Sequence, residues 1–218
     1  MKQLPSPRDL ESELVRSIGS SSLKELSTDL LEAAFDQFLS DGFVKDIPIL
    51  GTLAKLPATF GAVRDHIFTK KVAYFLLALS KVPEQDRTKF LTSVAARGEE
   101  RRVGETLLVL IDRLDNYDRA ALLAKVFTAF INERLSMDEF RRHARVVEQL
   151  PAGSTSALRA FYSPHRQGIE TGGEFLTQFA GLGLVTIEFY PTAGQSDIGG
   201  AYEKTELGKT FLAIVDDA

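Results

Sequence analysis

The feature of the sequence that most restricts its folding is an apolar stretch, residues 43–79, interrupted by glycine and proline. Gly51, Pro57 and Gly61 divide a run that would otherwise continue as one helix, because proline removes a backbone donor and glycine weakens helical order. Since the residue before a proline avoids helical geometry, the sequence predicts a break near Leu56. A helix on each side of this break would form an apolar hairpin.

Two roles are open to this hairpin: the centre of a helical core, or a segment that enters a membrane after a trigger. Core burial is favoured because residues 47–63 are too short to span a bilayer comfortably, and lipid cannot satisfy the backbone groups that proline and glycine expose. The basic residues that follow would suit a headgroup surface, so membrane perturbation by residues 47–79 stays an alternative. A charged cluster at residues 64–66 is expected to separate this half from a helix over residues 70–79. The candidate side chains for either role are Ile47, Leu50, Leu53, Leu56, Pro57 and Phe60.

The rest of the chain up to residue 150 shows the three- and four-residue apolar spacing of amphipathic helices. The spacing is clearest over residues 23–39, 103–114 and 117–135. These patterns, together with the apolar hairpin, predict an all-helical domain over residues 1–150.

Local signals mark the ends of several of these helices. Asn116 or Asp115 can cap the helix that starts at residue 117. Ser136 and Glu139 have the spacing of a capping box, in which each side chain accepts from the other's backbone amide. Gly98 marks a break between two helices.

The sequence pattern changes after residue 150. The order of elements is typical of a winged-helix module, in which two helices precede a β-hairpin. The expected elements are helices over residues 157–162 and 170–182, strands over residues 185–190 and 201–204, and a last helix that begins at Thr205. The predicted fold class is therefore mainly α, with a small α+β, winged-helix-like domain over residues 151–218.

Composition excludes several kinds of chemistry. The chain has no cysteine, which excludes disulfides, thiolate nucleophiles and cysteine-based zinc sites. Its histidines, His66, His143 and His165, are far apart and lack the spacing of a metal-binding pair. No GxGxxG follows a predicted strand, and no GxxxxGK[ST] loop is present. We therefore predict a non-enzymatic protein with no catalytic residue, no cofactor and no metal.

Charge argues against nucleic acid and for a protein partner. Residues 151–218 contain four basic and eight acidic residues. Their net charge of −4 is the same as that of the whole chain. An acidic surface repels the phosphates that supply much of the affinity for nucleic acids, so a winged-helix DNA-binding regulator stays an alternative only. Basic residues gather instead at Arg141, Arg142, Arg145 and His143. Either this group docks an acidic protein, or it is a solvated helix end that complements the helix dipole.

Two sets of motifs resemble known proteins. Gly181 to Val185 and Thr205 to Lys209 resemble the end of a winged-helix domain. The motifs Lys45-Asp46-Ile47-Pro48, Arg64-Asp65, Lys70-Lys71 and Gly104-Glu105 resemble an uncharacterised family of small bacterial proteins that is similar to the abortive-infection alpha proteins. The resemblance implies a role in phage defence or stress response, and it supplies no catalytic residues.

The expected function is therefore protein binding in a bacterial cell. Because the first residues lack the apolar run of a signal peptide, we expect a cytoplasmic protein, or one at the periphery of the inner membrane if the membrane alternative holds. The partner protein is unidentified, and the sequence is compatible with a homo-oligomer.

Overall fold

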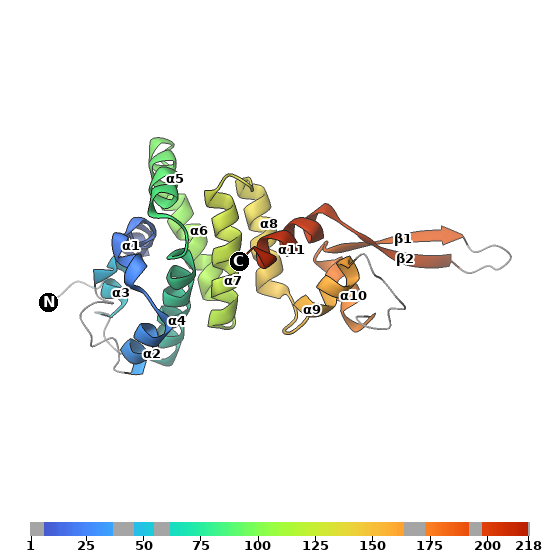
Figure 1. The fold of residues 1–218 in the computed structure, drawn as a ribbon, viewed down its shortest axis with the longest axis horizontal. Helices are drawn as coiled ribbons and strands as arrows, with labels where there is room; N and C mark the ends of the chain where they lie inside the picture. Colours follow the sequence, from blue (N-terminus) through green and yellow to red (C-terminus); the bar gives the residue numbers. More distant parts are fainter. Residues whose placement is uncertain (1–6, 37–45, 55–61, 164–172, 192–197, 218) are drawn as a thin grey trace. The chain divides into compact units, whose positions relative to one another are not determined.

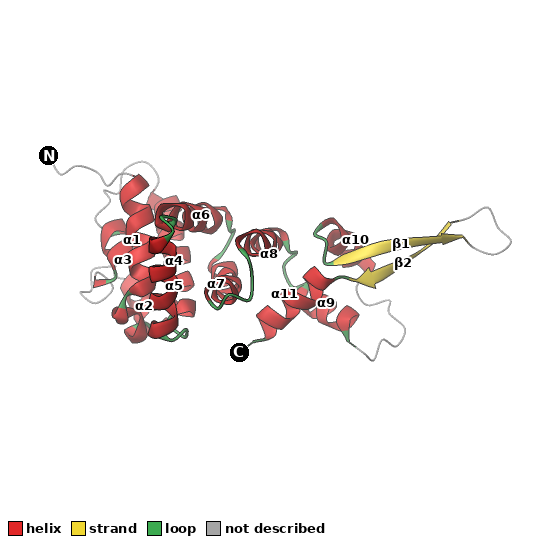
Figure 2. Ribbon diagram, turned by 90° about the horizontal axis from the view of Figure 1, so that it is seen from above, coloured by secondary structure: helices red, strands yellow, loops and turns green. Residues whose placement is uncertain are grey.

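The computed structural model describes residues 7–36, 46–54, 62–163, 173–191 and 198–217. These residues are mainly helical, with a two-stranded antiparallel sheet near the C-terminal end (Figures 1 and 2). This confirms the predicted fold class. The chain divides into two compact units, Met1–Phe140 (unit 1) and Arg141–Ala218 (unit 2).

The secondary structure in the described part of unit 1 is entirely helical. The longest of them, α4, packs along α7, and α1 lies against α3, α5 and α6. The elements are α1 (Pro7–Gly19), the 3-10 helix η1 (Ser21–Glu25), α2 (Thr28–Asp36), α3 (Pro48–Leu53), α4 (Ala62–Leu79), α5 (Glu84–Ala96), α6 (Glu100–Arg113), α7 (Tyr117–Ile131) and the start of α8 (Met137–Gln149). Phenylalanine rings from α4, α5, α7 and α8 contact one another in its core.

The prediction of one helix over residues 23–39 was wrong. The segment starts as η1, and Leu26 then adopts an extended conformation before α2 begins. Ser27 explains the interruption because its hydroxyl accepts a hydrogen bond from the amide of Leu30, as a helix N-cap does. The apolar positions on both sides of this interruption still face the core, since Leu23 and Leu31 are both buried.

The apolar stretch contributes α3 and α4. Pro48 starts α3 as expected, but residues 64–66 lie within α4 and not ahead of it. The reason is that residues 62–79 contain neither glycine nor proline, so nothing in the backbone stops the helix at the charged cluster. Leu56, Pro57 and Phe60, with the predicted break, lie outside the described residues.

The predicted helix ends were confirmed. Asn116 accepts from the amide of Arg119 at the start of α7. At the start of α8, the Ser136 hydroxyl accepts from the amide of Glu139, and the Glu139 carboxylate accepts from the amide of Ser136. Gly98, between α5 and α6, has a φ of +65°, which glycine adopts without steric cost.

Two buried cationic side chains of unit 1 donate hydrogen bonds to backbone carbonyls at or next to helix ends. The Arg87 guanidinium donates to the carbonyl oxygens of Ile18, Ser20 and Val82. Lys71 donates to the carbonyl oxygens of Asp112 and Leu114 at 2.7 and 2.8 Å. Because the last carbonyls of a helix lack partners within the helix and form the negative end of its dipole, Arg87 stabilises the end of α1, and Lys71 stabilises the end of α6.

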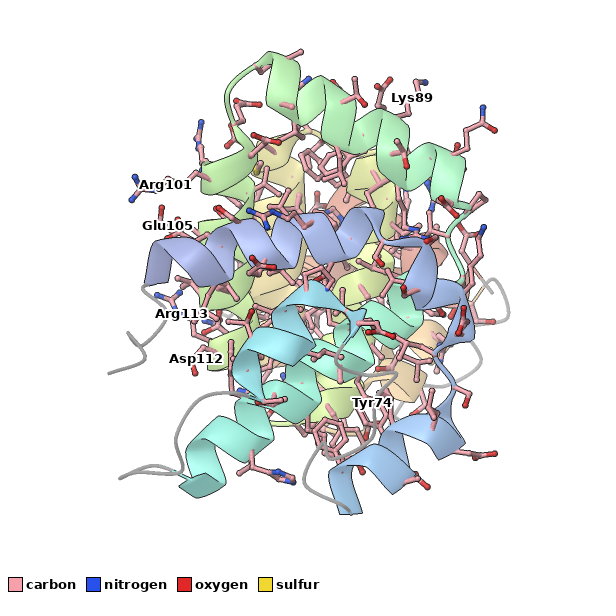
Figure 3. All side chains as sticks on the ribbon, turned by 90° about the vertical axis from the view of Figure 1, so that its left-hand side faces the viewer. Tyr74, Lys89, Arg101, Glu105, Asp112 and Arg113 are labelled. Carbon is pink, nitrogen blue, oxygen red and sulfur yellow. The ribbon has the colours of Figure 1, made fainter. Side chains whose placement is uncertain are left out.

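The contact between α1 and α6 depends on Gly104. A Cβ atom at this position would lie 2.6 Å from the carbonyl oxygen of Glu11. The two helices therefore approach more closely than an alanine would allow. The same crossing holds an ion pair, in which Arg101, labelled in Figure 3, donates to the Glu11 carboxylate at 3.1 Å.

Unit 2 continues α8 and adds α9 (Thr155–Tyr162), α10 (Gly173–Gly181), β1 (Val185–Pro191), β2 (Ile198–Lys204) and α11 (Glu206–Asp216). The elements follow the predicted order. The strands pair in an antiparallel register that sets Ile187 opposite Tyr202 and Phe189 opposite Gly200. The core of the unit is apolar, with buried side chains from α9, α10, β1 and α11 that include Leu158, Phe161, Phe179, Val185 and Phe211.

Tyr162 connects three segments of unit 2. Its hydroxyl donates to the carbonyl oxygen of Leu184, just before β1, at 2.5 Å. It accepts from the amide of Thr205, the N-cap of α11, at 2.9 Å. Gly208 makes room for the phenol, because a Cβ atom there would collide with the Tyr162 hydroxyl and the Leu184 carbonyl.

Candidate functional site

The candidate docking residues lie on α8, a helix with two distinct faces. Its buried side chains recur at helical spacing, from Phe140 through His143 and Ala144 to Val147. Arg141, Arg142 and Arg145 are exposed on the other side. Because residues three and four apart are neighbours on a helix surface, Arg145 lies beside both other arginines. We call these three residues the arginine face.

His143 does not belong to the arginine face, and its assignment to the basic group was wrong. The side chain is buried, and its ring stacks on Phe211 of α11 with the ring centroids 6.4 Å apart. The helical period explains this, since position 143 falls on the same side as Phe140, Ala144 and Val147.

The arginine face differs from other exposed arginines of the described chain in its carboxylate partners. Among the described residues, no carboxylate forms a salt bridge with Arg141, Arg142 or Arg145. Other exposed arginines each form a salt bridge with an Asp or Glu. These are Arg16, Arg97, Arg101, Arg102 and Arg159. Like charges at this spacing destabilise a helix by about 0.2–0.5 kcal/mol per pair. An incoming anionic group would relieve that repulsion.

The arginine face can therefore bind carboxylates. Each guanidinium presents a planar set of donors that fits a carboxylate in a bidentate manner. Its charge is permanent at physiological pH. What the arrangement offers is recognition of negative charge.

A second exposed surface is formed by β1 and β2. Along one face of β1 the side chains leave the core step by step: Val185 is 1% exposed, Ile187 37% and Phe189 73%. The other face carries Thr186 and Glu188, both exposed. The sequence predicted the strand but missed this exposure. The available signal was the Gly-Gly pair at the start of β2, which leaves Phe189 without a side chain opposite it.

The residues proposed for a core or a membrane segment are buried wherever the structure describes them. Ile47, Leu50 and Leu53 all belong to the core of unit 1. Among the described helices, none has the length and apolar character needed to cross a bilayer. The conditional membrane role stays a prediction, because a trigger would have to release these side chains from the core first.

Three of the resolved pKa shifts arise in ion pairs, and the shift of Tyr74 arises from burial. Hydrogen bonding and the charge of Lys24 lower the pKa of Glu84, and Arg97 lowers that of Glu99 in the same way. Glu206 raises the pKa of Lys209, and burial raises the pKa of Tyr74. Within the described part of the chain, no group of three or more metal-binding side chains is assembled.

Comparison of the chain with protein-family models, curated proteins and solved structures found no match. The arrangement of the arginine face and of the β-hairpin therefore carries the functional argument.

Proposed function

We propose that this protein acts by binding another protein, without catalysing a reaction, and that the arginine face receives an acidic surface of the partner. The observation that carries the proposal is the set of three adjacent exposed arginines for which the described chain provides no carboxylate. Arginine is enriched at protein interfaces because it combines charge, planarity and several donors.

An acidic protein is favoured over nucleic acid as the partner. Binding of a duplex draws on many phosphate contacts spread along a basic surface. The arginine face provides three positive charges, whereas the surface of unit 2 also exposes Glu188, Glu203 and Glu206. The helix α10, which precedes the hairpin, contains no lysine or arginine. A compact carboxylate-rich surface fits this distribution better than a polyanion does.

The biological setting is part of the proposal. The motifs at Lys45 to Pro48 and at Gly104-Glu105 resemble the family associated with phage defence. We therefore propose that the protein contact takes place in a bacterial defence or stress response. Infection of cells that carry or lack the gene, scored as phage yield, tests this part by itself.

The binding proposal is tested with a fluorescein-labelled peptide of eight glutamates and the full-length protein. The triple variant Arg141→Gln, Arg142→Gln, Arg145→Gln should lose about tenfold or more in affinity at low salt, because each ion pair contributes several tenths of a kcal/mol. The matched control removes three exposed arginines of α6, Arg101, Arg102 and Arg113. This control should stay within about threefold of the wild type.

Two outcomes would contradict the proposal. Equal losses in both triple variants would show that only the net charge of the protein matters. Tighter binding to a 20-base-pair duplex than to the peptide, with an affinity that falls steeply as salt is added, would favour the DNA-binding regulator.

A further inference from the structure

Unit 1 contains a cleft between α5 and the turn that joins α7 to α8. Its volume is about 720 Å³, within the range of about 300–1,000 Å³ that small-molecule sites occupy. Both walls belong to unit 1. The lining combines charged side chains with aromatic rings, and the residues that matter here are Asp86, Lys89, Phe90, Arg97, Phe130 and Glu133.

The apolar part of the cleft is aromatic. The rings of Phe90 and Phe130 lie edge to face, with their centroids 5.4 Å apart. Phe90 is 7% exposed, whereas Phe130 is only half-buried. A flat or bulky apolar group of a ligand can therefore pack on Phe130.

Charged side chains follow one side of α5. Asp86 and Lys89, the latter labelled in Figure 3, are three residues apart and so are neighbours on the helix surface. Within the described ranges of the chain, no group forms a hydrogen bond or an ion pair with the Asp86 carboxylate or the Lys89 ammonium. Arg97 differs, because its guanidinium donates to Glu99 at 2.7 Å and to Ser93 at 2.6 Å. The cleft therefore presents one negative and one positive charge side by side, and a ligand can reach both.

Glu133, on the turn that forms the other wall, has an unfavourable backbone conformation. Its φ of +58° is the only positive value at a residue other than glycine among those that the structure describes. Glycine is the usual residue in this conformation after a helix, because a side chain strains the backbone there. Strained residues cluster at functional sites, and this one brings a second carboxylate to the cleft.

We propose that the cleft binds a free α-amino acid with an aromatic or large apolar side chain. Such a molecule carries an ammonium and a carboxylate on one carbon atom, so it presents opposite charges side by side, as Asp86 and Lys89 do. Its ammonium pairs with Asp86, its carboxylate pairs with Lys89, and its side chain packs on Phe130. Glu133 offers a second acceptor for the ammonium. This inference concerns different residues from the arginine face and does not depend on it.

Titration of the isotope-labelled, full-length protein with L-phenylalanine, followed by heteronuclear NMR, tests the proposal. Amide signals of residues 86–97 and 130–136 should shift and saturate, with a Kd of about 0.1–1 mM because the ligand is small. L-Alanine lacks the ring and should bind about tenfold more weakly. Absence of saturable shifts at these amides with about 10 mM L-phenylalanine, or equal affinity for L-alanine, would overturn the proposal.

Two analogues of L-phenylalanine distinguish a free amino acid from the end of a peptide. N-Acetyl-L-phenylalanine keeps the ring and the carboxylate, and L-phenylalanine amide keeps the ring and the ammonium. Each lacks one of the two charges, so each should bind about three- to tenfold more weakly than the parent. If either analogue binds as tightly as L-phenylalanine, the paired recognition of both charges is wrong.

Variants of the two exposed charges assign their partners. Lys89→Gln should weaken the binding of L-phenylalanine about three- to tenfold and leave the affinity for its amide unchanged, because the amide has no carboxylate for Lys89. Asp86→Asn should likewise weaken L-phenylalanine and spare N-acetyl-L-phenylalanine. Lys81→Gln is the matched control, since Lys81 is exposed and does not line the cleft. Equal affinities of Lys89→Gln and Lys81→Gln for L-phenylalanine would contradict the proposed role of Lys89.

Glu133→Gly separates stability from binding. Glycine adopts the backbone conformation without strain, so the variant should unfold at a higher temperature than the wild type. It should also bind L-phenylalanine more weakly, because one carboxylate is lost. A variant that is more stable and binds L-phenylalanine as tightly as the wild type would contradict the functional explanation of the strain.

Discussion

Two groups of positive charge, one in each unit, are placed in opposite ways. In unit 1, Arg87 and Lys71 are buried and donate hydrogen bonds to carbonyl oxygens at or next to helix ends. In unit 2, the arginine face is exposed and meets no carboxylate of the described chain. Basic side chains thus hydrogen-bond to carbonyls at helix ends in unit 1, and they stay available to bind an anionic group in unit 2.

The difference follows from the cost of burying a charge. A buried cation is tolerated only when several acceptors replace its water. Arg87 has three carbonyl acceptors, and burial lowers the pKa of its guanidinium. Because Arg87 is fully buried, its donors, including the Nη2 atom that has no hydrogen-bond partner, are out of reach of a partner protein. Arg87 and Lys71 therefore stabilise the fold of unit 1, and variants should separate this role from the binding proposed for the arginine face.

The largest effect is expected at Arg87. Arg87→Met keeps most of the apolar volume but leaves the carbonyls of Ile18 and Val82 without the guanidinium donor, while the Ser20 carbonyl keeps only the amide of Leu23. We expect a loss of about 2–4 kcal/mol in the free energy of unfolding, since each unsatisfied buried acceptor costs about 1–3 kcal/mol and some will reach water. Urea titration followed by circular dichroism measures it. Arg142→Met, on the arginine face, should change stability by less than about 0.5 kcal/mol, and similar losses in both variants would remove the contrast between the units.

A somewhat smaller effect is expected at Lys71. Lys71→Met removes two hydrogen bonds and the charge at the end of α6. The expected loss is about 1–3 kcal/mol, because the Asp112 and Leu114 carbonyls lose their donor and the helix dipole its counter-charge. Amide hydrogen exchange should locate the loss in the last turn of α6. Uniformly faster exchange across unit 1, with no preference for that turn, would argue against a helix-capping role.

The close approach of α1 and α6 predicts a loss at Gly104. Gly104→Ala would normally favour a helix by about 1 kcal/mol. Here the added methyl group meets the backbone of Glu11, so the helices must separate and we expect a net loss of about 1–2 kcal/mol. Thermal unfolding measures it. Gly181→Ala is the control, since nothing lies within 4 Å of a Cβ atom there, and a Gly104→Ala protein as stable as this control would refute the steric argument.

The smallest effect concerns pH. Lys24 lowers the pKa of Glu84 in the folded protein through a contact of 2.6 Å between Nζ and the carboxylate. A carboxyl group whose pKa is depressed by folding stabilises the protein above its unfolded pKa, and the contribution disappears as the pH falls through the folded pKa. Glu84→Gln should therefore reduce stability slightly at pH 7 and not at all in strong acid. Unfolding free energies are measured between pH 2 and pH 7 for the wild type and for Glu84→Gln. The two proteins should become equally stable as the pH falls, and a constant difference at every pH would contradict the prediction.

The sequence predicted the features that depend on neighbouring residues. Caps at Asn116 and Ser136, and the alternation of β1, are local patterns, and the structure has them. The split between η1 and α2 was missed because the apolar spacing runs across it, while one hydroxyl, that of Ser27, decides the outcome. The burial of Arg87 could not be predicted either, since its acceptors Ile18 and Ser20 are distant in sequence.

The candidate site was predictable to a similar degree. The three arginines were found from composition along one helix, but their lack of carboxylate partners depends on where every acidic residue of the described chain lies. Exposure of Phe189 depends on how far the hairpin extends past its helices, which periodicity does not encode.

The pairing of Tyr162 with Gly208 has an evolutionary consequence. The phenol occupies the space that a methyl group at position 208 would need. The carbonyl oxygen of Leu184 would also collide with a Cβ atom at position 208, so glycine is required there by the backbone as well as by the tyrosine. Among natural variants of this chain, position 208 should therefore remain glycine even where the tyrosine at 162 has been replaced.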